Sequence, residues 1–285
     1  MTSIALIGAG GKMGCRITDH LRGHPAYALR CVECSERGIA NLAHRGVPPM
    51  PQDQAIAGAD VIILAVPDKL LGGVARDVVP KLRSGALVIT LDPAAAHAGE
   101  LPLRPDISYF ATHPCHPSVF DYEADAEARA DFFGGTTASM PVVCALMQGP
   151  EEHYALGEKL ARDFFAPVTR THRITVEQMA LLEPAMAETV GIALILALRE
   201  ALEEVVKRGV PRAAAEDFLY GHIKVPLGIA FERVNFSLSD GAKLIAEYGR
   251  QRVLQAGWKR VFEPESVREQ VRVIVSGQLP PPPQV

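Results

Sequence analysis

The chain has 285 residues, of which 48% are apolar and 22% charged, so it is long enough for two domains with substantial cores. Its net charge of −4 and pI of about 6.1 show no excess of basic residues of the kind that binds nucleic acid or an anionic membrane. The longest apolar run, Val190–Leu198, is interrupted by one glycine and is far shorter than the roughly 20 residues of a membrane span. No signal peptide is evident, and five cysteines, an odd number, predict reduced thiols and a cytoplasmic protein.

The chain opens with the pattern strand, glycine-rich turn, helix, strand. An apolar run, Ser3–Ile7, enters the turn, apolar residues then recur at helical spacing as far as Leu21, and Tyr27–Val32 is the next apolar run. The glycine spacing is GxxGxxG, a variant of the GxGxxG spacing of dinucleotide-binding turns, in which the backbone approaches a pyrophosphate at a helix N-terminus. A generic glycine-rich turn is the alternative. The residues predicted to contact the cofactor are Gly8, Gly10, Gly11, Lys12, Met13 and Gly14.

Glu33 ends the second apolar run, about 20 residues past the glycines. A carboxylate at this position accepts hydrogen bonds from the 2′- and 3′-hydroxyls of a ribose, whereas it would repel a 2′-phosphate. The sequence therefore favours NAD over NADP. Arg37 lies close enough in sequence to accommodate a phosphate, so NADP stays open as an alternative.

Short apolar runs alternate with helical patterns through the first 170 or so residues. Further strands are predicted over Val61–Val66, Ala86–Leu91, Tyr109–Thr112, Val142–Met147 and Pro167–Thr171. Helices are predicted over Leu70–Leu82 and Glu151–Phe165. This alternation predicts an α/β fold with a doubly wound, mostly parallel sheet of the Rossmann type.

From about Thr175 the pattern changes to long helices, the first of which begins with a capping box and is predicted to run to Gly209 with a kink at Pro184. Later helices are predicted over Arg212–Tyr220, Ser239–Ala256 and Pro264–Ser276. We therefore predict an NAD-binding domain over residues 1–173, an all-α substrate and dimerisation domain over 174–278, and a disordered proline-rich tail over 279–285. The long apolar helix predicts a homodimer.

Loops that follow strands are the places to look for ligands, because open parallel sheets bind them beyond the carboxyl ends of their strands. After the run Val61–Val66, the loop predicted to pass beneath the nicotinamide ribose contains Ala65, Val66, Pro67 and Asp68. A strand that simply ends at a proline would have the same pattern. Asp92 follows the next predicted strand, where its carboxylate could instead cap a helix.

Two histidines, His113 and His116, lie between prolines after the strand predicted over Tyr109–Thr112. Polyproline geometry repeats every three residues, so both imidazoles are expected to project to the same side at the ligand edge of the sheet. Two imidazoles there suit a metal site or an acid–base pair. A rigid His-Pro turn without chemistry is the alternative.

Two carboxylates of the long helix, Glu183 and Glu188, have no Lys or Arg at a neighbouring helical position. An unpaired carboxylate on an apolar helix surface is costly unless a cation or a substrate reaches it. On an ideal α-helix, five residues turn the chain by about 500° and leave the two side chains about 140° apart. One ion is then expected to bind only one of them, unless Pro184 distorts the helix. Contact with an arginine of the other domain or subunit is the alternative.

A histidine and a lysine, His222 and Lys224, lie beside a bend that is predicted to be bounded by Pro226. The ammonium group of Lys224 is a candidate to bind a substrate carboxylate. An ordinary exposed lysine is the alternative.

The order of these features resembles the 6-phosphogluconate dehydrogenase and β-hydroxyacid dehydrogenase superfamily. Members carry a general-acid lysine on the long interdomain helix, followed at helical spacing by an asparagine, whereas no lysine occurs here between Lys159 and Lys207. The glycine-rich opening, the paired His-Pro loop and the Gly-His-Ile-Lys segment are similar to those of the NAD-dependent D-apionate oxidoisomerases. The resemblance implies oxidation of a small branched polyhydroxy carboxylic acid with skeletal rearrangement, of the D-apionate to 3-oxo-isoapionate type.

The missing lysine is consistent with such chemistry, because a divalent metal ion can polarise the new carbonyl and ionise the neighbouring hydroxyl. The predicted ligands are His116 with Glu183 or Glu188. His113 or Glu188 would accept the hydroxyl proton, and Lys224 would hold the carboxylate. The alternatives are a dehydrogenase or reductase without rearrangement or metal, in which His116 is the acid, and an NAD-sensing module without turnover.

Overall fold

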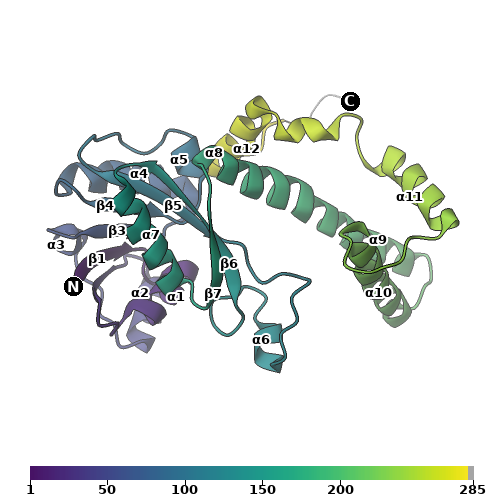
Figure 1. Cartoon of the computed structure of the whole chain (residues 1–285), viewed down its shortest axis with the longest axis horizontal. Coiled ribbons are helices and arrows are strands. Elements are labelled where there is room, and N and C mark those ends of the chain that lie inside the picture. The colour runs from purple at the N-terminus through teal and green to yellow at the C-terminus, as the bar shows by residue number, and fades with distance from the viewer. Residues whose placement is uncertain (282–285) are drawn as a thin grey trace. The chain divides into compact units, whose positions relative to one another are not determined.

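The computed structural model describes residues 1–281 (Figure 1). The chain divides into two compact units, Met1–Leu182 together with the segment that begins at Arg268, and Glu183–Val267. The sequence instead predicts a boundary after residue 173 and a second domain that continues to residue 278. Residues 282–285, which belong to the predicted disordered tail, lie outside the described part of the chain.

The first unit contains a seven-stranded sheet of order β2-β1-β3-β4-β5-β6-β7. The strands are β1 Thr2–Ile7, β2 Tyr27–Val32, β3 Val61–Leu64, β4 Leu87–Thr90, β5 Ser108–Pro114, β6 Met140–Gln148 and β7 Val168–Arg173. All neighbouring strands are parallel except β5 and β6, which are antiparallel. Each of the seven predicted strands is confirmed, and so is the mostly parallel sheet.

Helices cover both faces of this sheet, as a doubly wound fold requires (Figure 1). The helices of the first unit that precede the long helix are α1 Lys12–Leu21, α2 Glu36–His44, α3 Gln52–Ile56, α4 Asp68–Val78 with a 3₁₀ turn Val79–Lys81, α5 Ala94–His97, α6 Ala126–Ala130 and α7 Glu151–Phe164. One core layer includes Ile17 of α1 and Phe164 of α7, and the other includes Leu71 of α4. Every residue of β3 and β4 is buried, and apart from Thr90 at the end of β4 the two strands are continuous apolar runs rather than alternating ones.

The long helix is continuous but not α-helical throughout. It comprises α8 Val176–Ala180, a π-helical segment η2 Leu181–Ile192, and α9 Ala193–Lys207. The predicted capping box of Thr175 and Gln178 is confirmed. Pro184 lies inside the π-helical segment, where its missing N–H removes the α-type bond to the carbonyl of Ala180. The structure therefore has a π-helix where the sequence predicts a kinked α-helix.

The remaining helices are α10 Arg212–Ala230, α11 Asp240–Val253, a 3₁₀ helix η3 Trp258–Phe262, and α12 Pro264–Ser276. The predicted bend near His222 and Lys224 is wrong, because α10 passes through both residues and contains Pro226. A proline inside a helix removes one backbone hydrogen bond, and this helix tolerates that loss. The C-terminal helix α12 has the predicted bounds and buries Val271.

Large apolar side chains are exposed in the second unit, among them Ile195, Phe218 and Ile245, at 64%, 67% and 70% exposure. The helix over residues 176–207 has a window of mean hydropathy 1.8 that is only 11% buried, so by length and composition it could cross a membrane. The apolar part of this helix is longer than the run Val190–Leu198 indicates. A second protein surface would cover the same side chains equally well, so this is weak evidence for a membrane span.

Candidate functional site

The glycine-rich turn forms a cradle in which side chains have no room. Gly8 has a φ of +81°, and a Cβ on it would lie 2.4 Å from the carbonyl oxygen of Ala65. A Cβ on Gly14 would lie 2.0 Å from the carbonyl oxygen of Gly8, so α1 packs directly on the turn. Because α1 starts at Lys12 and its N-cap Gly11 supplies no side-chain hydrogen bond, the first N–H groups of the helix suit a pyrophosphate.

Glu33 follows β2, and the pairing of Ile7 with Val32 places it at the same sheet edge as Gly8. Its Oε2 accepts a hydrogen bond from the N–H of Gly10 at 2.9 Å, and its Oε1 accepts three from Cys34 and Ser35, also at 2.9 Å. Burial alone would raise the pKa of this carboxyl, but the hydrogen bonds hold the pKa below its ordinary value. Glu33 is therefore an ionised acceptor at neutral pH.

Gly38, in the first turns of α2, leaves the space that Glu33 occupies. A Cβ on Gly38 would lie 2.3 Å from the carboxyl carbon of Glu33, and the backbone oxygen of Gly38 is 2.1 Å from a Cβ built on Gly10. Gly38 was not predicted as a site residue, because a glycine inside a helical pattern carries no functional signal of its own.

The loop after β3 lies against the glycine-rich turn. Ala65 donates its N–H to the carbonyl of Ile7 at 2.8 Å, and Val66 Cγ1 is 3.0 Å from a Cβ built on Gly8. Pro67 is the N-cap of α4 and Asp68 its first residue. The predicted loop is thus beside the turn, and its contact with a nicotinamide ribose stays a prediction.

The two histidines lie close together, although not in polyproline geometry. His113 belongs to β5, which stays paired with β6 as far as Pro114, and His116 has a left-handed φ of +60°. The polyproline prediction is wrong because strand pairing continues through the first His-Pro pair. The centroids of the two rings are 6.1 Å apart, with an interplanar angle of 87°.

Backbone carbonyls fix the protonation pattern of both imidazoles. Nδ1 of His113 is 2.8 Å from the carbonyl oxygen of Leu91, and Nδ1 of His116 is 2.8 Å from that of Phe133. Since a carbonyl can only accept, each ring donates from Nδ1. In the neutral form Nε2 then carries the lone pair with which a histidine binds a metal ion or accepts a proton.

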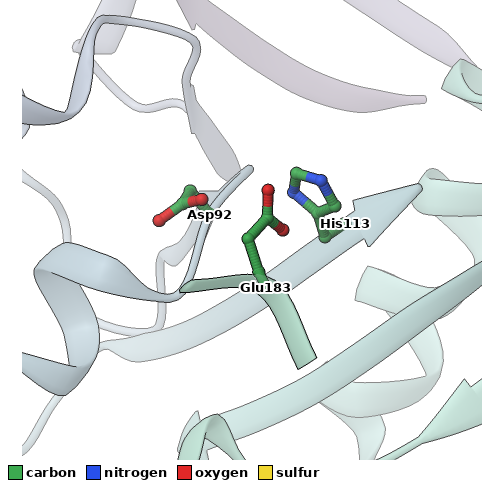
Figure 2. A group of neighbouring side chains, drawn as sticks. All are labelled: Asp92, His113 and Glu183. Carbon is green, nitrogen blue, oxygen red and sulfur yellow. The ribbon is translucent and has the colours of Figure 1, made fainter. Parts of the chain in front are cut away.

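Three side chains of this region could share one metal ion: Asp92, His113 and Glu183 (Figure 2). One ligand atom from each lies within 4.8 Å of the other two, and in Figure 2 the carboxylate of Glu183 lies between the other two side chains. Asp92 follows β4 and His113 is on β5, its parallel neighbour. Glu183 comes three residues after α8, which buries Val176, Met179 and Ala180.

Asp92 also caps α5, because its Oδ1 accepts a hydrogen bond from the N–H of Ala94 at 2.6 Å. The capping role that the sequence left open is confirmed. The same residue is nevertheless one of the three that could share a metal ion, a role that its sequence context did not predict. The available signal was its place at the end of the strand next to that of His113.

The group differs from the predicted ligand set, because it contains His113 rather than His116. Glu188 is exposed and lies five residues after Glu183. In a π-helix, hydrogen bonds join residues five apart, so side chains five residues apart project in more similar directions than the roughly 140° difference of an α-helix. Both carboxylates have interaction partners, so the premise that they are unpaired is wrong.

Lys224 is exposed on α10, and its role with a carboxylate stays a prediction.

Two carboxylates and one imidazole are a donor set that binds divalent first-row ions. Ligands on opposite sides of an ion whose bonds are about 2.0–2.2 Å long lie about 4.0–4.4 Å apart, so any pair near the 4.8 Å limit would have to approach by a few tenths of an ångström to bind it. Calcium takes oxygen ligands and would use mainly the two carboxylates. With three protein ligands, such a centre keeps positions open for substrate oxygens.

The family model described as "Phosphogluconate dehydrogenase (decarboxylating) C-term" matches residues 121–275. A protein of Rhizobium rhizogenes named D-apionate oxidoisomerase is 47% identical over 96% of this chain and 100% of its own length. A protein of the same name from Cupriavidus necator is 45% identical over 95% of this chain and 98% of its own length.

A solved structure covers nearly the same length. It is a semialdehyde dehydrogenase NAD-binding protein from Cupriavidus necator in complex with calcium and NAD, 45% identical, with a TM-score of 0.93. The match covers 96% of this chain and 99% of that one.

Proposed function

Because the chain belongs to the D-apionate oxidoisomerase family, within the 6-phosphogluconate dehydrogenase superfamily, we propose that it oxidises a small branched polyhydroxy carboxylic acid such as D-apionate and rearranges its carbon skeleton. NAD and a divalent metal ion are the proposed cofactors, as in the relative from Cupriavidus necator. The observation that carries the proposal is the group of Asp92, His113 and Glu183, which offers ligands for one metal ion.

The residues of the chain fit both cofactors. Glu33 would accept hydrogen bonds from the ribose hydroxyls, and the glycine-rich turn would receive the pyrophosphate. Asp92, His113 and Glu183 would hold the metal ion. When bound, NAD provides a hydride acceptor and the ion a Lewis acid.

Oxidation of the 2-hydroxyl removes a hydride from carbon and a proton from oxygen, and leaves a ketone. We place His113 among the ligands of the metal ion. We therefore propose that Nε2 of the neighbouring His116 accepts the proton of the 2-hydroxyl group. The left-handed backbone of His116 and its bond to the carbonyl of Phe133 hold this imidazole in one orientation. Loss of the proton of the neighbouring tertiary hydroxyl then allows one hydroxymethyl group to migrate, with its bonding electrons, from the tertiary carbon to the ketone carbon. The tertiary C–O becomes the new ketone and the old ketone becomes a hydroxyl, so the rearrangement needs no further oxidation.

The experiment is an assay of NAD reduction with D-apionate carrying ¹³C in both hydroxymethyl groups, followed by NMR of the product. An oxidoisomerase transfers one labelled carbon to the carbon that bears the carboxyl group, whereas a simple dehydrogenase leaves both labels on the tertiary carbon. Absence of NAD reduction with any branched sugar acid, alongside tight NAD binding, would indicate the sensing module instead.

Metal dependence has its own test, with Glu183→Gln compared with Glu200→Gln. Glu200 is exposed farther along the same helix and serves as the matched control. We expect the first change to lower the affinity for the ion by at least about tenfold, and the second to leave it unchanged. Full activity after dialysis against a chelator, with no metal in the purified protein, would contradict the proposed metal site.

We further propose that the exposed apolar surface of the second unit pairs with a second copy of the chain to form a homodimer. A cytoplasmic location is also proposed, since all five cysteines are free thiols.

A further inference from the structure

One aromatic ring, that of Phe133, contacts side chains from two different loops of the site. Nζ of Lys12 lies 3.9 Å from its centroid, and Cζ of Arg16 lies 4.4 Å from it. The ring centroid of His116 is 4.6 Å away. Lys12 belongs to the glycine-rich opening and His116 to the His-Pro loop, so a single half-buried side chain lies between the two.

The segment that carries Phe133 is anchored from both ends. The carboxylate of Asp131 accepts backbone hydrogen bonds from Gly134 at 2.9 Å and from Thr136 and Thr137 at 3.1 Å. Arg16 reaches Asp131 at 3.4 Å and the hydroxyl of Thr136 at 3.1 Å. These bonds fix the backbone of Phe133 against α1, and its ring with it.

An aromatic face holds a cation in a way that suits a phosphate-binding loop. The negative face of the ring attracts the ammonium group but, unlike a carboxylate, does not cancel its charge. Lys12 and Arg16 are four residues apart on α1 and would repel each other, and the ring between them offsets this repulsion. Lys12 is thereby oriented by the ring.

The same residue orients His116 in two ways. Its ring packs against the imidazole, and its carbonyl oxygen accepts the Nδ1 hydrogen bond. The direction of Nε2 therefore follows the position of Phe133.

We propose that Phe133 is a positioning residue that fixes Lys12 for the cofactor's phosphates and His116 for the substrate. The roles of Lys12 and His116 rest on the proposed function. The contacts of Phe133 with them do not.

The first test measures NAD binding by calorimetry, which needs no turnover. We expect Phe133→Leu to weaken NAD binding by about three- to tenfold, because the cation–π contact with Lys12 is lost. Phe133→Tyr keeps the aromatic face and should restore affinity to within about twofold of the unchanged protein. Phe132→Leu is the matched control, because the adjacent Phe132 is 88% exposed, and it should have no effect.

A double-mutant cycle with Lys12→Met shows whether the ring acts through the lysine. If it does, Phe133→Leu has little further effect once Lys12 has been replaced. Effects that multiply, or a Phe133→Leu variant that binds NAD normally, would overturn the proposal.

The second test records the NMR signals of the His116 ring protons, which the neighbouring Phe133 ring shifts by its ring current. Phe133→Leu should move these signals toward their ordinary positions, whereas Phe132→Leu should not. Unmoved signals would contradict the contact. Neither test measures turnover of a sugar acid, so failure of the proposed reaction would leave both results interpretable.

Discussion

At the scale of single residues, Glu33 is the side chain expected to set the preference for NAD over NADP. Four hydrogen bonds from Gly10, Cys34 and Ser35 hold its carboxylate in place before any ligand arrives. We expect Glu33→Gln to raise the KM for NAD by about tenfold and to reduce the preference for NAD over NADP, because the amide loses a charged acceptor. Steady-state assays with both nucleotides measure this. Glu36→Gln, at an exposed position of α2, is the control, and an unchanged NAD preference in Glu33→Gln would contradict the assigned role.

Asp131 provides a pH-dependent contribution to stability. Burial would raise the pKa of its carboxyl, but the backbone hydrogen bonds around it lower the pKa below the ordinary value. A depressed pKa in the folded state means that the stabilisation is complete above the unfolded pKa of about 4 and is lost as the pH falls through the folded value.

We therefore expect Asp131→Asn to lower the free energy of unfolding by about 1–3 kcal/mol at pH 7. The difference from the unchanged protein should shrink as the pH falls below about 4, because the native carboxyl is then protonated too. Urea unfolding at a series of pH values measures both quantities. Asp121→Asn, at an exposed position of the same region, should show no such trend, and a pH-independent difference for Asp131→Asn would refute the assignment.

The histidines mark the limit of sequence reasoning about residues. Their residue types and spacing indicated chemistry, and they do lie next to each other. Which imidazole joins Glu183 depends on how far β5 extends and on the left-handed backbone of His116. The length of β5 follows from tertiary pairing with β6, and the His116 ring is bonded to the carbonyl of Phe133; the local pattern of His-Pro pairs contains neither contact.

At the scale of elements, the glycine-rich turn was predictable because its constraint is local. The contact between α1 and the turn leaves no space at Gly14, where a Cβ would lie 2.0 Å from the carbonyl oxygen of Gly8. We expect Gly14→Ala to destabilise the protein by about 2 kcal/mol or more and to abolish NAD binding, since backbone must move.

Gly73→Ala is the matched control for this change. Gly73 is exposed in α4, and nothing lies within 4 Å of a Cβ built on it. Alanine there should stabilise the protein by about 0.5–1 kcal/mol through helix propensity. Thermal unfolding and NAD calorimetry on both variants provide the comparison. A Gly14→Ala variant as stable as Gly73→Ala would show that α1 does not pack on the turn as described.

The π-helical segment could not be predicted in the same way. Apolar periodicity indicated a helix, and Pro184 indicated a distortion, but neither distinguishes a kink from a change of hydrogen-bond register. The distinction matters for function, because it decides whether Glu183 and Glu188 project to one side. Only the pattern of backbone bonds across the whole segment contains that information.

At the scale of the molecule, the strand pattern predicted the sheet because buried parallel strands are continuous apolar runs. The division of the chain was harder to predict. Val271 is buried although α12 follows a run of helices in sequence, and the segment from Arg268 belongs to the first compact unit. The return of the chain to the first unit after the helices of the second depends on long-range contacts, and the local periodicity of the sequence does not contain them.

The exposed apolar side chains of the second unit lead to the last prediction, which concerns assembly. A symmetric dimer buries each such side chain twice, and full burial of one contributes about 1.5–3 kcal/mol. Ile195 is 64% exposed on α9. We expect the unchanged protein to sediment as a dimer and Ile195→Glu to weaken the dimer by at least about 100-fold.

Leu103→Glu is the control for this change, because Leu103 is 75% exposed in the first unit, and it should leave the dimer intact. Sedimentation of all three proteins at several concentrations measures the dissociation constants, and flotation with lipid vesicles tests the competing possibility of a membrane. Monomers of the unchanged protein throughout the concentration range, or flotation that Ile195→Glu abolishes, would mean that the apolar surface has a different partner. A concentration-dependent dimer that only Ile195→Glu disrupts would instead place α9 in the contact between two copies.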